Sequence, residues 1–278
     1  MDYRTILVDI GPSARTGDRI AFAAGLAAVQ RAHLVGITQT GIDRFLRDSA
    51  LPGIDPGALA PLFEQLRLDA GVRAAQFDMQ VKQAGVASFE HRIGDDDPGN
   101  ALATRAMYAD LVIVSQRDPS SAHGTTDLAV PEFVAMNAPC PVLVLPWAGS
   151  HAPTFDRVLV AWNASPEAAR AVRQALPLLQ QAGRVEVAIV DDDRARARAP
   201  AAGTDIGQFL ARHGVSAHLR EQPAGGDVAE ALLSLAGDAG ADLLVLGCSG
   251  HSRFRELVLG GVTRTILQRL TLPALMAH

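Results

Sequence analysis

The sequence contains two copies of one pattern, and this repeat constrains the fold more than any other feature. "ADLVIVSQ", starting at Ala109, matches "ADLLVLGC", starting at Ala241, an offset of 241 − 109 = 132 residues. Near the start of each copy, "ILVDIGPS" from Ile6 matches "VLVAWNAS" from Val158, an offset of 158 − 6 = 152. The chain is therefore expected to fold as two similar units in tandem.

The difference between the two offsets locates an insertion. The first copy is longer by 152 − 132 = 20 residues, and this excess falls between about residues 41 and 86. Within it, residues 42–66 mix apolar side chains with Pro and Gly, which could form a lid, a dimer contact or a surface loop. Residues 147–156 are rich in Gly, Ser and Pro, as linkers are. We predict domains at residues 1–148 and 155–278.

Composition narrows the class of protein. Hydrophobic residues make up 48% of the 278 residues, and the net charge of −5 argues against a nucleic-acid binder, whose binding surface is usually basic. The N-terminal sequence lacks the regions of a signal peptide, and no apolar run reaches the roughly 20 residues that span a bilayer. Two cysteines are too few for a disulfide framework. We expect a cytoplasmic protein that binds neither nucleic acid nor membrane.

Strand-like and helix-like segments alternate within each copy. In the second copy, Ser165 followed by Pro166 has the pattern of a helix start, and Asp227 can cap the helix that follows it. "DLLVLG" is a continuous apolar run typical of a strand buried on both faces, whereas "SAHLREQ" alternates and favours a strand near a sheet edge. The pattern predicts an α/β fold: two tandem Rossmann-like domains, each an open five-stranded, mostly parallel sheet with helices on both faces.

A glycine-rich loop, "GCSGHSRFRELVLGG" from Gly247 to Gly261, follows the most apolar strand of the second copy. Ligands of open α/β sheets bind at the carboxyl ends of the strands, where this loop begins. The helix that follows the loop offers unpaired N–H groups and partial positive charge, which suit phosphate. The loop therefore indicates a phosphate site, with a turn and a helix cap as the structural alternative. Side chains that could assist are His251, Arg253, Arg255 and Thr263.

The spacing G-x2-G-x9-G at Gly247, Gly250 and Gly260 resembles the ATP-binding signature of universal stress proteins, and the resemblance extends over both copies. It implies a tandem universal stress protein that binds ATP in its second domain. It also implies that the last strands of the domains, "PVLVLPW" and "PALMAH", lie at the interface between them. By the same resemblance, Ala161, Val190 and Leu246 would line the adenosine pocket. The loop and the resemblance together give these candidate cofactor-binding residues: Ala161, Asn163, Val190, Leu246, Gly247, Gly250, His251, Arg253, Gly260, Gly261, Val262 and Thr263.

Two positions of the second copy depart from the family pattern. Gly261 stands where the family has Ser or Thr, and Asn163 stands where it has Asp. The first change removes a hydroxyl that would contact phosphate, and the second replaces a charge-assisted hydrogen bond by a weaker neutral one. We therefore expect ATP binding weak enough for the protein to purify empty. Mg²⁺, if present, would arrive with ATP through phosphate oxygens and water.

The first copy departs much further from the family pattern. Leu128 stands opposite Gly260 and adds bulk. Asp118 stands opposite Gly250 and adds a negative charge that repels phosphate. Pro131, opposite Thr263, has no backbone N–H. We expect this copy to bind no ATP in the family manner and to serve as the partner in an intramolecular pseudo-dimer, with a homodimer as a further option. The residues concerned are Gly11, Ser115, Asp118, Leu128, Ala129 and Pro131.

No residue is assigned a catalytic or a metal-binding role. Cys248 could be a reactive thiol, but a packed, inert thiol is the favoured interpretation. His251 could serve as a base, against a solvent-facing or capping role. The acidic runs at residues 95–97 and 191–193 lack the spacing of metal ligands and resemble turns or helix starts.

These observations predict a cytoplasmic stress-response protein that binds ATP or a related adenine nucleotide in its C-terminal domain. A regulatory role is favoured because the sequence reveals no poised base, nucleophile and orienting third group. Slow hydrolysis of ATP by water near the phosphates is the enzymatic alternative. An interaction module that works without nucleotide is the third possibility.

Overall fold

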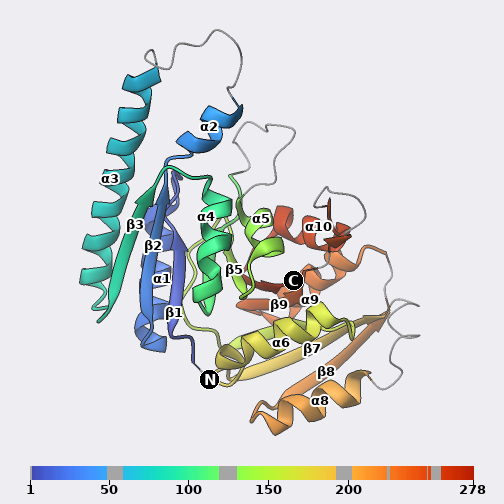
Figure 1. Ribbon diagram of the computed structural model, residues 1–278. Coiled ribbons are helices and arrows are strands. Elements are labelled where there is room, and N and C mark those ends of the chain that lie inside the picture. The colour runs from blue at the N-terminus through green and yellow to red at the C-terminus, as the bar shows by residue number, and fades with distance from the viewer. Residues whose placement is uncertain are drawn as a thin grey trace.

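Strands and helices alternate along the chain, as the sequence pattern predicts (Figure 1). The computed structural model describes residues 2–48, 59–118, 130–191, 202–223, 226–248, 250–251 and 258–278. The strands of the N-terminal half are β1 (Thr5–Asp9), β2 (His33–Gln39), β3 (Phe89–Gly94), β4 (Leu111–Ser115) and β5 (Val142–Leu145). Its helices are α1 (Thr16–Gln30), α2 (Ile42–Asp48), α3 (Ala60–Gln83), α4 (Pro98–Arg105) and α5 (Val130–Asn137).

The C-terminal half has the same order of elements. Its long strands are β6 (Arg157–Ala161), β7 (Arg184–Asp191), β8 (Ala217–Pro223), β9 (Leu243–Gly247) and β12 (Ala274–Ala277). Its helices are α6 (Pro166–Leu179), α8 (Ala202–Arg212), α9 (Val228–Ala239) and α10 (Gly261–Arg269). Inside the glycine-rich loop, two short antiparallel strands that the sequence did not predict form a ribbon, β10 (Gly250–His251) and β11 (Val258–Leu259).

All the longer strands belong to one sheet, in the order β3-β2-β1-β4-β5-β12-β9-β6-β7-β8. Neighbouring strands are parallel except at the centre, where β5 and β12 run antiparallel with Leu143 opposite Leu275. The last strands of the two copies therefore meet, as predicted. Each half contributes five strands, but they form one continuous ten-stranded sheet rather than two sheets. Both central strands are fully buried, so pairing them satisfies N–H and C=O groups that would otherwise lack partners.

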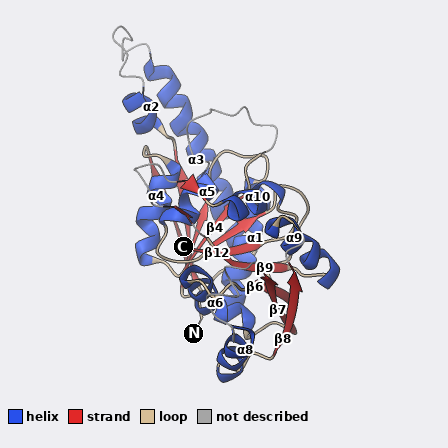
Figure 2. Cartoon of the chain, turned by 90° about the vertical axis from the view of Figure 1, so that its right-hand side faces the viewer, coloured by secondary structure: helices blue, strands red, loops and turns tan. Residues whose placement is uncertain are grey.

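The helices cover both faces of this sheet (Figure 2). One hydrophobic core joins the sheet to α1, α3, α6 and α8, and a second core joins it to α4, α5, α9 and α10. Each core contains side chains from both halves of the chain. The two copies therefore share their cores as well as their sheet.

Hydrogen bonds also cross between the halves. The Gln116 side chain, just after β4, donates through Nε2 to the carbonyls of Leu267 and Gln268 at 2.9 Å each, at the end of α10. The hydroxyl of Tyr3 donates to the carbonyl of Gln174 in α6 at 2.7 Å. Burial raises the pKa of Tyr3, so this hydroxyl keeps its proton and remains a donor.

Local sequence signals set the helix ends in the C-terminal half. The hydroxyl of Ser165 accepts a hydrogen bond from the N–H of Ala168, and Pro166 occupies the first position of α6. A carboxylate oxygen of Asp227 accepts from the N–H of Ala229 and caps α9. Gly240 ends α9 at φ 58°, a left-handed conformation that favours glycine. β8 forms one edge of the sheet, as its alternating sequence predicts.

The described parts of the insertion in the first copy are helical. Residues 42–48 form α2, and the second part of the insertion starts the 24-residue helix α3. Figure 1 shows α3 along the outer edge of the N-terminal half. Among the described helices, α3 included, none has the length and apolarity needed to cross a membrane.

Candidate functional site

A cavity of about 140 Å³ lies in the C-terminal half, at the carboxyl ends of β6, β7 and β9. Helices α9 and α10 complete its wall. β7 and β9 both pair with β6 in parallel, so the three strands end at the same edge of the sheet. The cavity is lined by Ala161, Trp162, Asn163, Ala188, Val190, Val228, Leu232, Leu246, Gly247, Val262 and Thr263.

Seven of the residues predicted from the sequence line this cavity. They come from three strands, from the turn after β6 and from the first turn of α10: Ala161, Asn163, Val190, Leu246, Gly247, Val262 and Thr263. Gly260 directly precedes α10, and Gly250 and His251 form β10. Arg253 and Arg255 lie outside the described residues. The structure thus gathers widely separated parts of the sequence at one place.

Four lining residues were not predicted: Trp162, Ala188, Val228 and Leu232. The sequence holds a signal for two of them. Ala188 lies two residues before Val190 and therefore on the same face of β7. Leu232 lies one turn after Val228 in the helix that Asp227 caps. The indole N–H of Trp162 is buried and has no hydrogen-bond partner among the described residues.

Gly247 owes its residue type to packing rather than to approach by a ligand. A Cβ atom at this position would lie 2.4 Å from the backbone nitrogen of Ala168 and 2.6 Å from the carbonyl carbon of Glu167. Both atoms belong to the first turn of α6, which lies directly against the end of β9. The first glycine of the motif is therefore required for the fold.

The N-terminus of α10 presents unpaired backbone donors next to the cavity. The helix starts at Gly261, one residue earlier than the sequence suggests, with Gly260 as the residue before it at φ −61° and ψ 148°. Helix geometry leaves the N–H groups of the first turn without partners inside the helix. A Cβ atom at Gly261 would meet nothing within 4 Å. This end of α10 therefore has both the donors and the space that an anionic group needs.

Thr263 and Cys248 contact one another below this helix end. Thr263 is 1% exposed and Cys248 is fully buried. Burial raises the pKa of Cys248 to about 12, although a hydrogen bond with Thr263 acts in the opposite direction. The thiol also lies 3.5 Å from the sulfur of Met136. Cys248 is therefore a packed, protonated thiol, and the hydroxyl of Thr263 already has a partner other than phosphate.

Asn163 supports the turn between β6 and α6. Its side-chain oxygen accepts a hydrogen bond from the N–H of Ser165 at 3.1 Å. Ala164, between them, has φ 57°, which is unusual for a residue with a side chain. The second lone pair of this oxygen and the amide NH₂ are the groups that Asn163 can offer to a ligand.

The N-terminal half has other side chains at two register positions that line the cavity in the C-terminal half. Strand register places Ile37 beside Asp9, where the C-terminal half has Ala188 beside Ala161. Ile37 is 2% exposed and belongs to the same core as Ala188. In place of the small residues Ala188 and Ala161, the N-terminal half thus has the large Ile37 and the charged Asp9. Leu128 and Ala129, which the sequence places opposite the last glycines, lie outside the described residues.

Asp9 is held by a buried ion pair. Its carboxylate lies 3.0 Å from a terminal nitrogen of Arg19, whose side chain is 3% exposed. Arg19 also donates to the hydroxyl of Ser115, the residue in the place of Gly247, and to the carbonyl of Gly11. These contacts join β1, β4 and α1 at the carboxyl end of β1.

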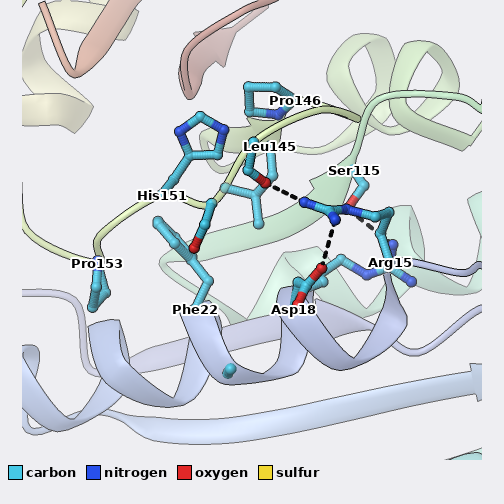
Figure 3. Close-up of a pocket in the computed structure, with 12 residues that line it drawn as sticks. Arg15, Asp18, Phe22, Ser115, Leu145, Pro146, His151 and Pro153 are labelled. Atoms are coloured by element: carbon cyan, nitrogen blue, oxygen red, sulfur yellow. Dashed lines mark hydrogen bonds and ion pairs between the residues drawn. The ribbon is translucent and has the colours of Figure 1, made fainter.

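A second cavity, of about 230 Å³, lies between α1 and the connection that follows β5 (Figure 3). Its cationic groups are already neutralised. Arg15 forms an ion pair with Asp18 at 3.0 Å and donates to the carbonyl of Gly149, while Arg19 is paired with Asp9. The contact from Arg15 fixes the connection against α1. We therefore assign this cavity a structural role.

The acidic runs have structural partners where the structure describes them. Asp95 forms an ion pair with Arg67 at 2.7 Å, and the hydrogen bond from Arg67 lowers the pKa of Asp95. Asp97 caps α4 by accepting from the N–H of Asn100. Asp191 ends β7, and residues 192–193 lie outside the described part. Among the described residues, no group of three or more His, Cys, Asp or Glu side chains could hold a metal ion.

Comparisons with known proteins agree with this arrangement. Residues 154–278 match the model of the universal stress protein family. A universal stress protein from Archaeoglobus fulgidus aligns with 98% of this chain and 97% of its own, with a TM-score of 0.69 and 15% identity. A protein from Pseudomonas aeruginosa described as a universal stress protein covers 99% of this chain and 93% of its own, with a TM-score of 0.58 and 20% identity.

One further structure is that of a universal stress protein in complex with cAMP, which aligns over 53% of this chain and 100% of its own at 21% identity, with a TM-score of 0.37. No curated protein matches the sequence. The whole-chain alignments show that both halves share the universal stress protein fold, and the family match covers the half that holds the cavity.

Proposed function

We propose, from the universal stress protein domain in residues 154–278, that the C-terminal half binds an adenine nucleotide, ATP or a close relative, and thereby regulates a stress response in the cytoplasm. The observation that carries this proposal is the cavity of about 140 Å³ at the carboxyl ends of β6, β7 and β9, next to the N-terminus of α10. It combines apolar walls for a base with backbone donors for phosphate.

The described walls fit an adenine nucleotide. Ala161, Ala188, Val190 and Leu246 offer small or flat apolar surface, and the buried indole N–H of Trp162 can donate a hydrogen bond to a ligand. The amide of Asn163 and the first N–H groups of α10 would hold the sugar and the phosphates. When bound, the triphosphate supplies negative charge that the helix N-terminus stabilises. Mg²⁺ would accompany it through phosphate oxygens and water.

A regulatory role is supported by the chemistry of the lining. None of the eleven described residues that line the cavity has a side chain that is charged near neutral pH. General acid or base catalysis most often uses the side chain of His, Asp, Glu, Lys, Tyr or Cys, and the described lining contains none of these. We therefore place the protein among nucleotide-dependent regulators. Slow hydrolysis by water near the phosphates and a nucleotide-independent interaction module are the alternatives.

The N-terminal half acts in this proposal as a partner that binds no nucleotide. Ile37 and Asp9 stand at the register positions of Ala188 and Ala161, which line the cavity in the C-terminal half. We further propose that residues 1–148 and 155–278 are the two domains of an intramolecular pseudo-dimer joined through β5 and β12.

Three outcomes with purified protein separate the alternatives. The protein is denatured and any released ligand is identified by mass spectrometry, and ATP is then added to a second sample to follow ADP. Released or bound adenine nucleotide without ADP formation supports the regulator. Accumulation of ADP supports the hydrolase. Absence of both, including in titrations at millimolar ATP, supports the interaction module.

Gly260→Val is expected to weaken ATP binding about tenfold, or roughly 1.4 kcal/mol. A valine side chain would cover the first N–H groups of α10, whereas the backbone at φ −61° accepts any residue, so the fold should persist. Calorimetric titration with ATP measures the loss. Gly237→Val is the matched control, because Gly237 is exposed in α9 and a Cβ there meets nothing within 4 Å. Equal ATP binding by wild type and Gly260→Val would disprove the phosphate assignment.

The double variant Asn163→Asp with Gly261→Ser is expected to bind ATP several-fold more tightly, by about 1 kcal/mol. An aspartate can keep the hydrogen bond from Ser165 while adding a charge, and the open space at Gly261 accepts a serine hydroxyl. Titration with labelled ATP measures the gain, with Gly261→Ala as the control that adds no hydroxyl. If the folded double variant shows no gain, this cavity does not serve ATP.

A further inference from the structure

The outward face of α3 is apolar, although the helix already packs on the sheet with its other face. The inward side chains are Ala70, Ala74, Phe77 and Val81. On the opposite side, Leu68, Val72, Ala75 and Met79 follow one another at intervals of four, three and four residues, which places them in one stripe. Leu68 is 57% exposed, Val72 69% and Met79 54%. A contiguous exposed apolar stripe of this kind is typical of a contact surface for a partner.

The pseudo-equivalent helix of the other half serves as an internal comparison. α8 occupies in the C-terminal half the place of α3 between the second and third strands. Its exposed positions are Thr204, Asp205, Gln208, Ala211 and Arg212, which are mostly polar or charged. Position in the fold therefore does not explain the apolar stripe of α3.

Small residues would let another helix approach this face closely. Gly71 and Ala75 lie one turn apart beside the stripe. Gly is less favourable than Ala inside a helix, and a Cβ at Gly71 would meet none of the described residues within 4 Å. The packing of the monomer therefore does not require a glycine there.

Two charged residues beside the stripe, Glu64 and Lys82, favour a second copy of this chain as the partner. Glu64 and Lys82 are exposed and lie 18 residues apart, five helical turns, so they share one flank of α3. The ammonium of Lys82 lies 6.0 Å from the ring of Phe89, at the edge of the sheet. If a second α3 packs antiparallel around a twofold axis at residue 73, midway between them, Glu64 of each copy lies beside Lys82 of the other. The same register brings Leu68 within one residue of Met79 in the partner, and Gly71 opposite Ala75.

We propose that the outward face of α3 is a homodimer contact, in which α3 packs antiparallel on α3 of a second copy of this chain. In this dimer the stripe is buried, and the ion pair between Glu64 of one copy and Lys82 of the other forms twice. The contact also gives the insertion of the first copy a function. The contact lies at the outer edge of the N-terminal half, away from the helices α9 and α10 that border the cavity (Figure 1). It does not depend on nucleotide.

Charge reversal tests this register in the full-length protein. Wild type should sediment at twice its monomer mass of 29.2 kDa at micromolar concentration. Glu64→Lys and Lys82→Glu should each raise the dissociation constant about tenfold, because each places two pairs of like charges across the twofold axis. The variant carrying both substitutions should regain the wild-type dissociation constant, because the pairs re-form with opposite sign.

A second variant tests the apolar stripe, with sedimentation equilibrium as the measurement. Val72→Glu should abolish the dimer and leave a folded monomer, since position 72 is exposed in the single chain and would be buried near the twofold axis. Met107→Glu is the matched control, because Met107 is 67% exposed outside α3, and the dimer should persist. Circular dichroism verifies the fold of each variant. A wild type that stays monomeric at all concentrations, or a dimer unaffected by Val72→Glu, overturns the proposal.

Discussion

Replacing Arg19 with methionine is expected to lower the free energy of unfolding by about 3–5 kcal/mol. The guanidinium is 3% exposed and holds the Asp9 carboxylate at 3.0 Å, together with the hydroxyl of Ser115 and the carbonyl of Gly11. Methionine fills a similar volume but leaves the carboxylate of Asp9, 13% exposed, without its ion-pair partner. The free-energy cost of leaving the Asp9 carboxylate buried without a partner is larger than the net stabilisation that the ion pair provides. Equilibrium unfolding in urea measures the change.

The matched control for this prediction is Arg92→Met. Arg92 pairs with Glu90 at 2.6 Å, but both side chains are more than 40% exposed, so the expected change is below about 1 kcal/mol. Adding Asp9→Asn to Arg19→Met should recover part of the lost stability, because it removes the unpaired negative charge of Asp9. If Arg19→Met and Arg92→Met cost the same, the buried pair does not stabilise the N-terminal half.

Ala188→Ile is expected to abolish nucleotide binding in the C-terminal half, with an affinity loss of at least about a hundredfold, or roughly 3 kcal/mol. The substitution introduces the residue type of the N-terminal half, where Ile37 occupies the register position of Ala188. A cavity of about 140 Å³ leaves no room for both the larger side chain and a base. The N-terminal half shows that isoleucine is compatible with the fold here. Calorimetric titration with ATP measures the loss.

Ala211→Ile provides the control for the added side chain. Ala211 is exposed on α8, a helix that does not line the cavity, so the same substitution there should leave ATP binding unchanged. The melting temperature of Ala188→Ile separates loss of binding from loss of fold. A folded Ala188→Ile variant with wild-type affinity for ATP would place the nucleotide elsewhere.

Much of the fold follows from the sequence because its signals are local. Ser165, Pro166 and Asp227 occupy the helix starts that their residue types favour. The repeat predicts the five long strands of each half, and the last strands of the two copies lie at their interface, as predicted. The fusion of both halves into one sheet did not follow, since the pairing of β5 with β12 depends on how two copies face one another.

The candidate site was predicted only in part, for a physical reason. Residues with a motif spacing, such as Gly247 and Gly260, could be found from the sequence. Trp162 and Val228 also line the cavity, and no local pattern in the sequence marks them as lining residues. The steric requirement for glycine at position 247 could not be predicted, because its contact with α6 joins residues about 80 positions apart in the chain. The correspondence of Ile37 to Ala188 became visible only through strand register.

The central pairing of β5 with β12 has a consequence for synthesis on the ribosome. β12 is the last of these strands in the sequence, yet it lies at the middle of the sheet. After β5 emerges, its N–H and C=O groups form an open edge until β12 has been translated, more than a hundred residues later. At roughly 5–20 residues per second, that edge stays uncovered for on the order of ten seconds. During this interval the N-terminal half of a nascent chain can pair with the same edge of a neighbouring nascent chain, so translation rate and polysome spacing become determinants of correct assembly.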